Sequence, residues 1–386
     1  MARGCGLRIF SIEIQQLPAQ ADTAPFIDFA ADLYRGDKGW VPPLRREVKN
    51  QLCRHNNPFF EHAEMALFTA WQNGRIVGRC SAQIDHAHLA THQDGAGFFG
   101  FFDTIDDPRA AQALIDAAGQ WCRARGMQTL RGPFSLCINE EIGVMVEGFD
   151  LPSMLLTPYH RPHQGILAEA AGLRPVKDVL TWGYDCAAPL PTRVQQAYDA
   201  MMALPEVRFR PIDRRHLARE MAIVRDIFNE AWADNWCFVP WSDAELAKAV
   251  KEFEMVLIDR LAMIAEINGE PAAIAICLPN LNDVIHDLDG RLGAVGLLKL
   301  LWRVKAKNPV SAKMPLMGMR KAVRRNRRYA GLATALCVSI HHGFRELGVQ
   351  RAELGWTLED NHLVNAMIRR IGSQPVKRHR VYEMAL

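Results

Sequence analysis

The sequence predicts a mixed α/β protein that holds two copies of one fold, in which each copy has a mixed sheet. Two Asn-Gly turns, each between apolar strand-like runs, mark one hairpin in each half of the chain. Later in each half, a helix pattern ends in Arg-x-x-Gly-x-Gln and a strand follows. Because these landmarks recur in the same order, we infer an internal duplication.

The hairpins follow a Val-Pro pair in both halves. Asn73-Gly74 comes 32 residues after Val41, and Asn268-Gly269 comes 29 residues after Val239. Asn-Gly favours the two-residue turns that join antiparallel strands. The expected strands are 65–71 and 76–84 in the first half, and 261–267 and 272–278 in the second.

The second helix pattern is the clearer of the two. Its apolar residues are spaced by three and four, which indicates one buried helix face, and Gly348 ends it. A strand is expected at 350–358, and a further helix runs to Gly372. The apolar face consists of Leu332, Leu336, Ile340, Phe344 and Leu347.

A cluster of prolines separates the halves. Pro189, Pro191 and Pro205 lie around a short helix pattern. We therefore expect a first domain at 1–186, a linker at 187–210 and a second domain at 211–386. The second copy is longer than the first, and its extra residues fall at 279–313.

The composition is that of a globular protein, with 49% hydrophobic and 23% charged residues. A net charge of +3 and the lack of an aromatic platform argue against a nucleic-acid partner. The nine cysteines contain no Cys-x-x-Cys, so we expect neither disulfides nor a metal site, and a reducing, cytoplasmic location. No apolar run reaches the roughly 18 residues of a membrane-spanning helix, and no signal peptide is recognised.

A basic segment precedes the helix that starts near Leu332. Six of the nine residues from 320 to 328 are basic, and Arg328, Gly331 and Ala333 fit the spacing Arg/Gln-x-x-Gly-x-Gly/Ala. A glycine turn exposes backbone N–H groups, and the helix adds its positive end. One arginine guanidinium can donate two parallel hydrogen bonds to phosphate oxygens. These features predict a pyrophosphate site; the alternatives are a solvated basic loop or a nucleic-acid patch.

This order of strand, loop, helix, strand and helix resembles the C-terminal half of the GNAT acyltransferase superfamily. In GNAT proteins the matching loop grips the pyrophosphate of acyl-CoA. The chain also resembles, over nearly its whole length, a family of long two-domain bacterial GNAT proteins that includes ceramide synthases. The phrases that carry this resemblance are 33–44, 57–63, 97–102, 139–141, 148–150, 235–240 and 358–361.

The resemblance implies tandem GNAT-like domains in which only the second binds acyl-CoA. The first copy has Asp106-Asp107 where the phosphate loop would lie, and we expect these residues to begin a helix with Pro108. In the second copy, a strand expected at 314–323 would polarise the thioester carbonyl through backbone N–H groups of Met319 to Ala322. The cofactor-binding candidates are Met319, Arg320, Lys321, Ala322, Val323, Arg328, Tyr329, Ala330, Gly331, Leu332, Ala333 and Asn361.

Amine acylation also needs a proton acceptor. The candidates are Glu140 and Glu141 in the first copy and Glu359 and Asp360 in the second. Each has a plainer interpretation, as a helix cap or as a solvated carboxylate. His286 with Asp287 is a further pair to consider.

A tyrosine often protonates the leaving thiolate in GNAT enzymes, shortly before the closing glycine of the last helix. The corresponding residues 366–372 contain none. Tyr382 or water are the alternatives.

Aromatic residues gather where GNAT proteins bind their acceptors. We take Trp232, Asn235, Trp236 and Phe238 as substrate-binding candidates, with the acceptor between the two domains. The resemblance implies transfer of an acyl group from acyl-CoA to a primary amine, and a long-chain, sphingoid-like amine is the preferred acceptor. An N-acetyltransferase acting on a small molecule or protein amine, and a non-catalytic acyl-CoA-binding module, remain alternatives.

The segment 296–307 is rich in leucine and basic residues. It fits peripheral contact with the inner face of a membrane, where its lysines would meet anionic headgroups. It equally fits a helix that packs on its own domain and whose lysines extend outward.

Overall fold

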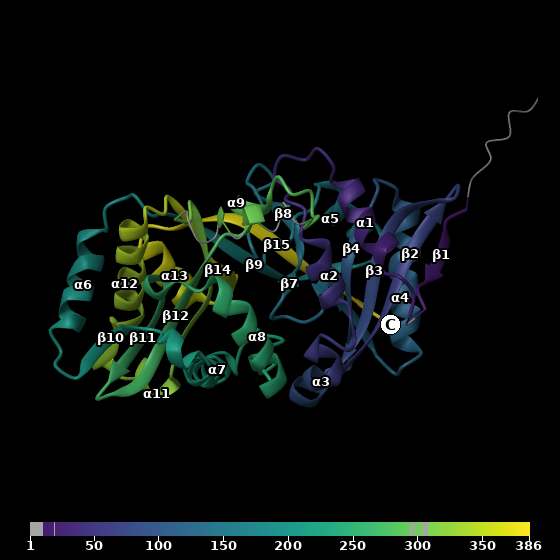
Figure 1. Cartoon of the computed structure of the whole chain (residues 1–386). Helices are drawn as coiled ribbons and strands as arrows, with labels where there is room; N and C mark the ends of the chain where they lie inside the picture. The colour runs from purple at the N-terminus through teal and green to yellow at the C-terminus, as the bar shows by residue number, and fades with distance from the viewer. Residues whose placement is uncertain (1–10, 19, 294–295, 297, 301, 304–307) are drawn as a thin grey trace, which may run out of the picture.

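The computed structural model describes residues 11–18, 20–293, 296, 298–300, 302–303 and 308–386. These residues form one 13-stranded mixed sheet with helices on both faces (Figure 1). Within them, two strand pairs, β4–β5 and β13–β14, are parallel. The order across the sheet is β1-β2-β3-β4-β5-β15-β9-β14-β13-β12-β11-β10, with β8 beside β15.

The first half contains the hairpin that the sequence predicts. Asn73 and Gly74 have φ of 53° and 75°, the left-handed values that a tight hairpin turn requires. The Asp107 side chain accepts a hydrogen bond from Arg109 N and caps the helix that starts at Pro108, as expected. The elements are β1 (Glu13–Gln16), α1 (Ala24–Leu33), α2 (Arg45–Gln51), η1 (Pro58–Glu61), β2 (Ala63–Gln72), β3 (Arg75–Asp85), α3 (His86–His92), β4 (Ala96–Thr104), α4 (Pro108–Arg123), β5 (Thr129–Gly132), β6 (Phe134–Ser135), β7 (Glu141–Ile142), β8 (Val144–Glu147), α5 (His163–Ala170) and β9 (Arg174–Asp185).

The second half repeats this plan. Its hairpin turns at Asn268 and Gly269, with φ of 53° and 82°, and its long helix ends at Gly348, with φ of 74°. The elements are α6 (Thr192–Met202), β10 (Val207–Pro211), η2 (Arg214–His216), α7 (Leu217–Trp232), α8 (Asp243–Val256), η3 (Asp259–Leu261), β11 (Ala262–Ile267), β12 (Glu270–Pro279), α9 (Asn282–Ile285), β13 (Ser311–Met319), α11 (Lys321–Arg324), η4 (Arg327–Tyr329), α12 (Leu332–Leu347), β14 (Arg351–Leu358), α13 (His362–Arg370) and β15 (Gln374–Ala385).

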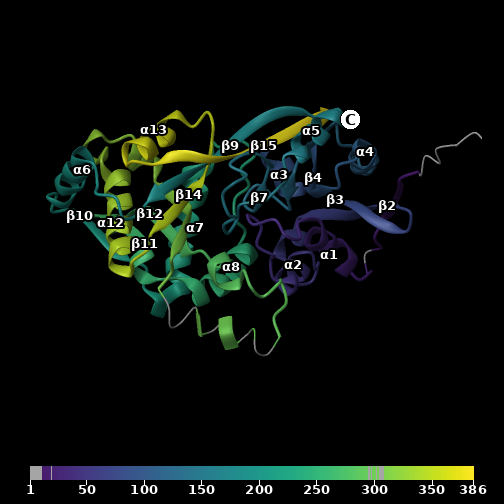
Figure 2. The ribbon, with the colours of Figure 1, turned by 90° about the horizontal axis from the view of Figure 1, so that it is seen from above.

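The two halves exchange their last strands. Strand β9 of the first half pairs with β14 of the second, and β15 of the second half pairs with β5 of the first. The two exchanged strands also pair with each other at the centre of the sheet, where they run side by side between the halves (Figure 2). The strand order therefore reads alike from both edges, as a duplicated fold requires.

The predicted linker, 187–210, contains ordered elements of the second half. Helix α6 packs against α12, and most of β10, which pairs with β11, falls in the same range. The domain limits of 1–186 and 211–386 stay a prediction. Each half contributes its last strand to the sheet of the other half, so limits along the sequence do not coincide with limits in space.

Helices cover both faces of the second half of the sheet. Side chains of β12 alternate between these faces, as the pleat of a strand dictates. Ala273, Ala275 and Cys277 belong to a core with α6, α12 and α13. Ile274 and Ile276 belong to a core with α7 and α8. A strand that is buried on both faces explains the continuous apolar run in the sequence.

Candidate functional site

Strands β13 and β14 diverge and leave a wedge in the sheet. They pair only between Ser311–Met314 and Arg351–Leu354. Beyond that point, β13 stays paired with β12, and β14 follows β9 after an irregularity between Leu354 and Thr357. Between the separated ends lies a cavity of about 390 Å³.

The cavity connects the two faces of the sheet. On one face it reaches the start of α12, and on the other it reaches the end of α7. Its lining is mainly apolar, with several flexible methionines, and a few polar groups lie around it. The described lining includes Trp232, Asn235, Met314, Met317, Met319, Arg324, Tyr329, Ala330, Ala333, Thr334, Cys337, Leu354, Trp356, Asn361, Leu363 and Met367.

The strand before the phosphate loop begins and ends earlier than the sequence predicts, at Ser311 and Met319. Lys321 already begins the short helix α11, so the expected range of 314–323 is wrong at both ends. The cause of the early end is Glu230 of α7. Its carboxylate accepts hydrogen bonds from Arg320 Nη1 at 2.8 Å and from Lys321 N at 2.7 Å, and so turns the chain away from the sheet.

This turn reduces the set of backbone donors. Arg320 N already donates to Ala272 O, and Lys321 N is bound to Glu230. Because successive N–H groups of a strand point to opposite sides, Met319 N–H points into the wedge. Met319 lines the cavity, whereas Arg320, Lys321, Ala322 and Val323 are not among its described lining residues.

The loop before α12 contributes Tyr329 and Ala330 to the cavity, and the first turn of α12 contributes Ala333. Arg328 points elsewhere, because its Nε lies 2.5 Å from Glu206 Oε1 beyond the end of α6. Leu332 is fully buried in the core. Arg324, which we did not single out from the sequence, lines the cavity instead.

Gly331 allows a close contact between two helices, and its expected role at the pyrophosphate stays a prediction. A Cβ at Gly331 would lie 3.3 Å from Met201 Cγ and 3.5 Å from Ala197 O, both on α6. The missing side chain therefore lets α6 pack closely on the start of α12, and it does not face the wedge.

The carboxylates of the second half are bound to strand β9. Glu359 Oε1 accepts from Asp178 N at 3.1 Å, and Asp360 forms an ion pair with Lys177 at 2.6 Å. Their neighbour Asn361 caps α13 by accepting from Val364 N, and it does line the cavity. Glu359 and Asp360 lie outside the described lining.

The aromatic candidates divide into two groups. Trp232 and Asn235 line the cavity, and Trp232 packs edge-on against Trp356 at 6.0 Å between ring centroids. Trp236 packs instead against Phe134 of the first half. Phe238 is buried in the core with α7 and α8.

Glu140 lies near α8 of the second half, whereas Glu141 on β7 lies near Asp103 and Arg79 of the first half, and both are half-buried. Burial raises the pKa of each carboxyl to about 7. For Glu140, the negative charges of Glu252 and Glu245 on α8 act in the same direction, while Lys248 opposes them. Both carboxyls lie outside the described lining of the cavity.

The other groups considered do not reach the cavity. His286 Nδ1 contacts Asp283 O at 3.0 Å, while Asp287 binds Arg303 and Lys299, so the two do not form a base and its partner. Tyr382 is buried in the core of the first half.

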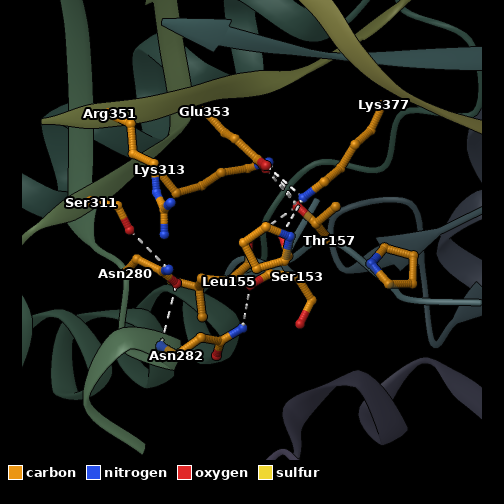
Figure 3. Close-up of polar contacts among 12 residues, drawn as sticks. Ser153, Leu155, Thr157, Asn280, Asn282, Ser311, Lys313, Arg351, Glu353 and Lys377 are labelled. Atoms are coloured by element: carbon orange, nitrogen blue, oxygen red, sulfur yellow. Dashed lines mark hydrogen bonds and ion pairs between the residues drawn. The ribbon is translucent and has the colours of Figure 1, made fainter. Parts of the chain in front are cut away.

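A buried ion cluster holds the closed end of the wedge (Figure 3). Glu353 on β14 accepts from Lys313 on β13 at 3.1 Å and from Lys377 on β15 at 2.6 Å. All three residues are at most 5% exposed. Lys313 also donates to Thr157 Oγ1 at 2.8 Å, so a loop of the first half is tied to this end of the wedge.

Two more contacts bind the same loop. Asn282 Nδ2 donates to Ser153 O at 3.1 Å (Figure 3). Lys377 Nζ donates to Pro152 O at 2.6 Å. We missed this cluster in the sequence. The available signal was Lys313, directly before the strand expected at 314–323, and Glu353 inside the strand expected at 350–358.

The matching wedge of the first half is filled by its own chain. A Cβ at Gly100 of β4 would lie 1.8 Å from Phe134 O. Gln83 Nε2 holds the inserted segment by donating to Phe134 O at 2.6 Å and to Leu136 O at 3.1 Å. The first half therefore keeps the fold and lacks the open wedge of the second.

Comparisons with known proteins agree with this architecture. The chain is 37% identical over 368 residues to bacterial ceramide synthase of Caulobacter vibrioides, which covers 95% of both chains. It is 36% identical over 363 residues to protein YghO of Escherichia coli, covering 94% of this chain and 92% of that one. No model of a protein family matches the chain.

Solved structures share the fold at low identity. A tandem GNAT protein from the clavulanic acid biosynthesis pathway superposes with a TM-score of 0.57 at 15% identity, covering 97% of this chain and 98% of that one. A GCN5-related N-acetyltransferase from Sphaerobacter thermophilus gives 0.52 at 12% identity, covering 97% and 95%. These matches confirm the predicted fold class of tandem GNAT-like domains, and the relationship to bacterial ceramide synthase makes the chain an acyltransferase of this type.

Within that class, the chain belongs to the family of long, two-domain bacterial GNAT proteins that contains bacterial ceramide synthase.

Proposed function

We propose that this protein transfers an acyl group from acyl-CoA to the primary amine of a long-chain, sphingoid-like acceptor. The observation that carries the proposal is the wedge cavity, which is apolar and passes from the start of α12 through the sheet to Trp232 and Asn235. An apolar passage suits two hydrocarbon chains better than a small polar amine. The relationship to bacterial ceramide synthase favours the same acceptor class.

In this proposal acyl-CoA occupies the wedge of the second half alone. The first-turn N–H groups of α12, at Ala333 and Thr334, and the guanidinium of Arg324 bind the pyrophosphate. Met319 N–H binds the thioester oxygen and stabilises the negative charge that develops there. The filled wedge of the first half supports a single cofactor site per chain.

The amine nitrogen attacks the thioester carbon, the C–S bond breaks, and the CoA thiolate leaves with a proton from water. One proton must leave the attacking nitrogen for a base, which then passes it to the hydroxide that remains when water protonates the thiolate. Glu140 and Glu141 remain the proposed bases, because a pKa of about 7 suits proton transfer near neutral pH. Neither lines the cavity, so the proposal requires a bridging water or a closing movement of the halves.

The same proposal includes peripheral membrane contact through the segment 296–307. Of its described residues, Leu298 is 69% exposed and Trp302 is 58% exposed, and their spacing places them on one helix face. Lys299 and Arg303 are bound to Asp287, so they do not serve as headgroup contacts here. Residues 297, 301 and 304–307 lie outside the described residues. Among the described helices, none has both the length and the apolar character to cross a bilayer.

Turnover with matched substrates tests the proposal. Acetyl-CoA and palmitoyl-CoA are each offered with sphinganine and with a polyamine, and the amide product is quantified. N-Palmitoyl sphinganine as the main product supports it. Acetylated polyamine as the main product would favour a small-molecule N-acetyltransferase, and binding of palmitoyl-CoA without any product would favour a non-catalytic module.

A pair of neighbouring arginines supplies the control for the cofactor site. Arg324 lines the cavity and Arg325 does not, although both are exposed. Arg324→Ala should weaken CoA binding about 10-fold or more, as expected for loss of a charge-assisted hydrogen bond. Arg325→Ala should leave it nearly unchanged, and equal losses in both variants would argue for a general charge effect.

A further inference from the structure

A second, smaller void lies behind the wedge cavity. Three residues line both spaces, namely Met314 on β13, Leu354 on β14 and Cys337 on α12. Their side chains are therefore the wall between the cavity and the void. The rest of the void is lined by Tyr184, Leu190, Val338, Phe344 and Ile371.

The void lies further along α12 than the cofactor end of the cavity. The cavity meets α12 from Ala333 to Cys337, and the void meets it from Cys337 to Phe344. The void itself is small, about 10 Å³, and its contacts on α12 lie on the C-terminal side of those of the cavity. The space behind the wall thus extends away from the phosphate-binding end.

The chemistry of this region suits hydrocarbon only. The lining is apolar apart from Tyr184, whose hydroxyl is held by His341 Nδ1 at 2.7 Å. A buried phosphate, amide or amine would find no charged partner among these lining residues, and burying it would be costly. A methylene chain has no such requirement.

Strand pairing and a buried ion pair fix the backbone at the wall. Met314 and Leu354 are the last register partners before β13 and β14 diverge. Their preceding residues, Lys313 and Glu353, are joined in the buried ion cluster (Figure 3). Widening the wedge at this point would break that pair, so the space available depends on side-chain volume.

We propose that Met314, Cys337 and Leu354 form the end wall of the acyl-binding part of the cavity and set the longest acyl chain that the protein accepts. The inference rests on the proposed function, because it assumes that the acyl group of acyl-CoA enters this cavity. The unbranched Met314 side chain can also adapt its shape to the chain end.

The test measures affinity and kcat/KM for saturated acyl-CoAs of increasing even chain length. Each additional buried methylene raises affinity by about fourfold until the chain meets the wall. Met314→Ala joins the cavity to the void and should move the optimum to longer chains by at least two carbons. Cys337→Phe fills the same space and should move it to shorter chains.

Met367→Ala is the matched control, since Met367 lines the cavity but not the void. It should change the affinity for all chain lengths by a similar factor. Circular dichroism and thermal unfolding establish that each variant is folded. If Met314→Ala fails to fold, Met314→Val makes the same test with a smaller loss of volume.

An unchanged optimum in the folded Met314 and Cys337 variants would overturn the inference and leave the acyltransferase proposal standing. Failure of the unmodified protein to bind any acyl-CoA would instead overturn the proposed function itself. Direct binding, measured by calorimetry, distinguishes the two failures without relying on turnover.

Discussion

At the scale of single residues, the stability of the second half depends strongly on the charge balance around Glu353. One carboxylate serves two lysines, and all three residues are buried. The lysines hold the pKa of Glu353 below its usual value, although burial opposes them. Burial lowers the pKa of Lys313, the positive charge of Lys377 acts in the same direction, and the carboxylate of Glu353 opposes both.

Replacing Glu353 by glutamine should therefore be strongly destabilising. It leaves two buried ammonium groups without a counter-charge, at a cost of about 3–5 kcal/mol in the free energy of unfolding. Glu346→Gln is the control, because its ion pair with Arg260 is exposed and worth at most about 1 kcal/mol. Urea unfolding of both variants makes the measurement, and equal losses would show that the buried cluster is not special.

The raised pKa values of Glu140 and Glu141 predict that stability depends on pH. The sign of this dependence is opposite to that expected for an ion-paired carboxylate. Their folded-state pKa is raised to about 7, above the unfolded value, so the folded state binds more protons between about pH 4.5 and 7. Stability should fall as the pH rises through this window. Glu140→Gln and Glu141→Gln should raise the melting temperature at pH 8 and have little effect near pH 4.5.

The same two variants test catalysis. If either carboxylate is the base, its glutamine variant loses turnover but still binds CoA, and the pH dependence of the rate weakens. Two variants with normal rates at every pH would move proton removal to Glu359, Asp360 or water.

The basic loop shows what the sequence could reveal about individual residues. Its pattern predicts a binding segment, and Tyr329, Ala330 and Ala333 do line the cavity. It could not reveal that Arg328 is bound to Glu206, because that partner lies far away in the sequence. The orientation of a side chain depends on such partners, and local spacing does not contain them.

At the scale of elements, prediction succeeded where the signal was local. Both hairpins, the apolar face of α12 and the Asp107 cap follow from neighbouring residues. The end of β13 was wrong, because Glu230 of α7 turns the chain after Met319. The sequence did not reveal the wedge either, because the wedge forms where β13 stays paired with β12 and β14 stays paired with β9.

The contact of α6 with α12 gives a prediction about Gly331. Its φ of −87° suits any residue, so Gly331→Ala should be tolerated after a small shift of Met201. Gly331→Glu should push α6 away and cost about 1–3 kcal/mol of stability through overpacking. Thermal unfolding and CoA calorimetry are measured on both variants. A Gly331→Glu protein with unchanged stability but no CoA binding would show that the glycine faces the ligand after all.

At the scale of the whole molecule, the duplication was predictable and the strand exchange was not. Ordered landmarks reveal two copies in the sequence. Strands β9 and β15 follow the same kind of helix in each half, and nothing local says which partner each one takes. The pairing of β9 with β14, and of β15 with β5, is decided by the assembled sheet.

The exchange predicts that the second half does not fold properly alone. A chain of residues 187–386 lacks β9, so β14 loses its antiparallel neighbour, and β15 loses both β9 and β5. Exposed strand edges next to apolar surface favour aggregation. We expect this fragment to aggregate, which size-exclusion chromatography measures, and to bind no acyl-CoA.

Co-expression with a separate chain of residues 1–186 should restore a soluble complex, because that chain supplies β9 to the second half and β5 to β15. It also supplies Thr157, which donates to and accepts from the buried ion cluster at the closed end of the wedge. Thr157→Val in the separate chain provides the control, since it removes those hydrogen bonds but keeps both strands. It should give a complex that assembles and is less stable. A monomeric fragment 187–386 with full acyl-CoA affinity would contradict the prediction, because the wedge would then need no strand from the first half.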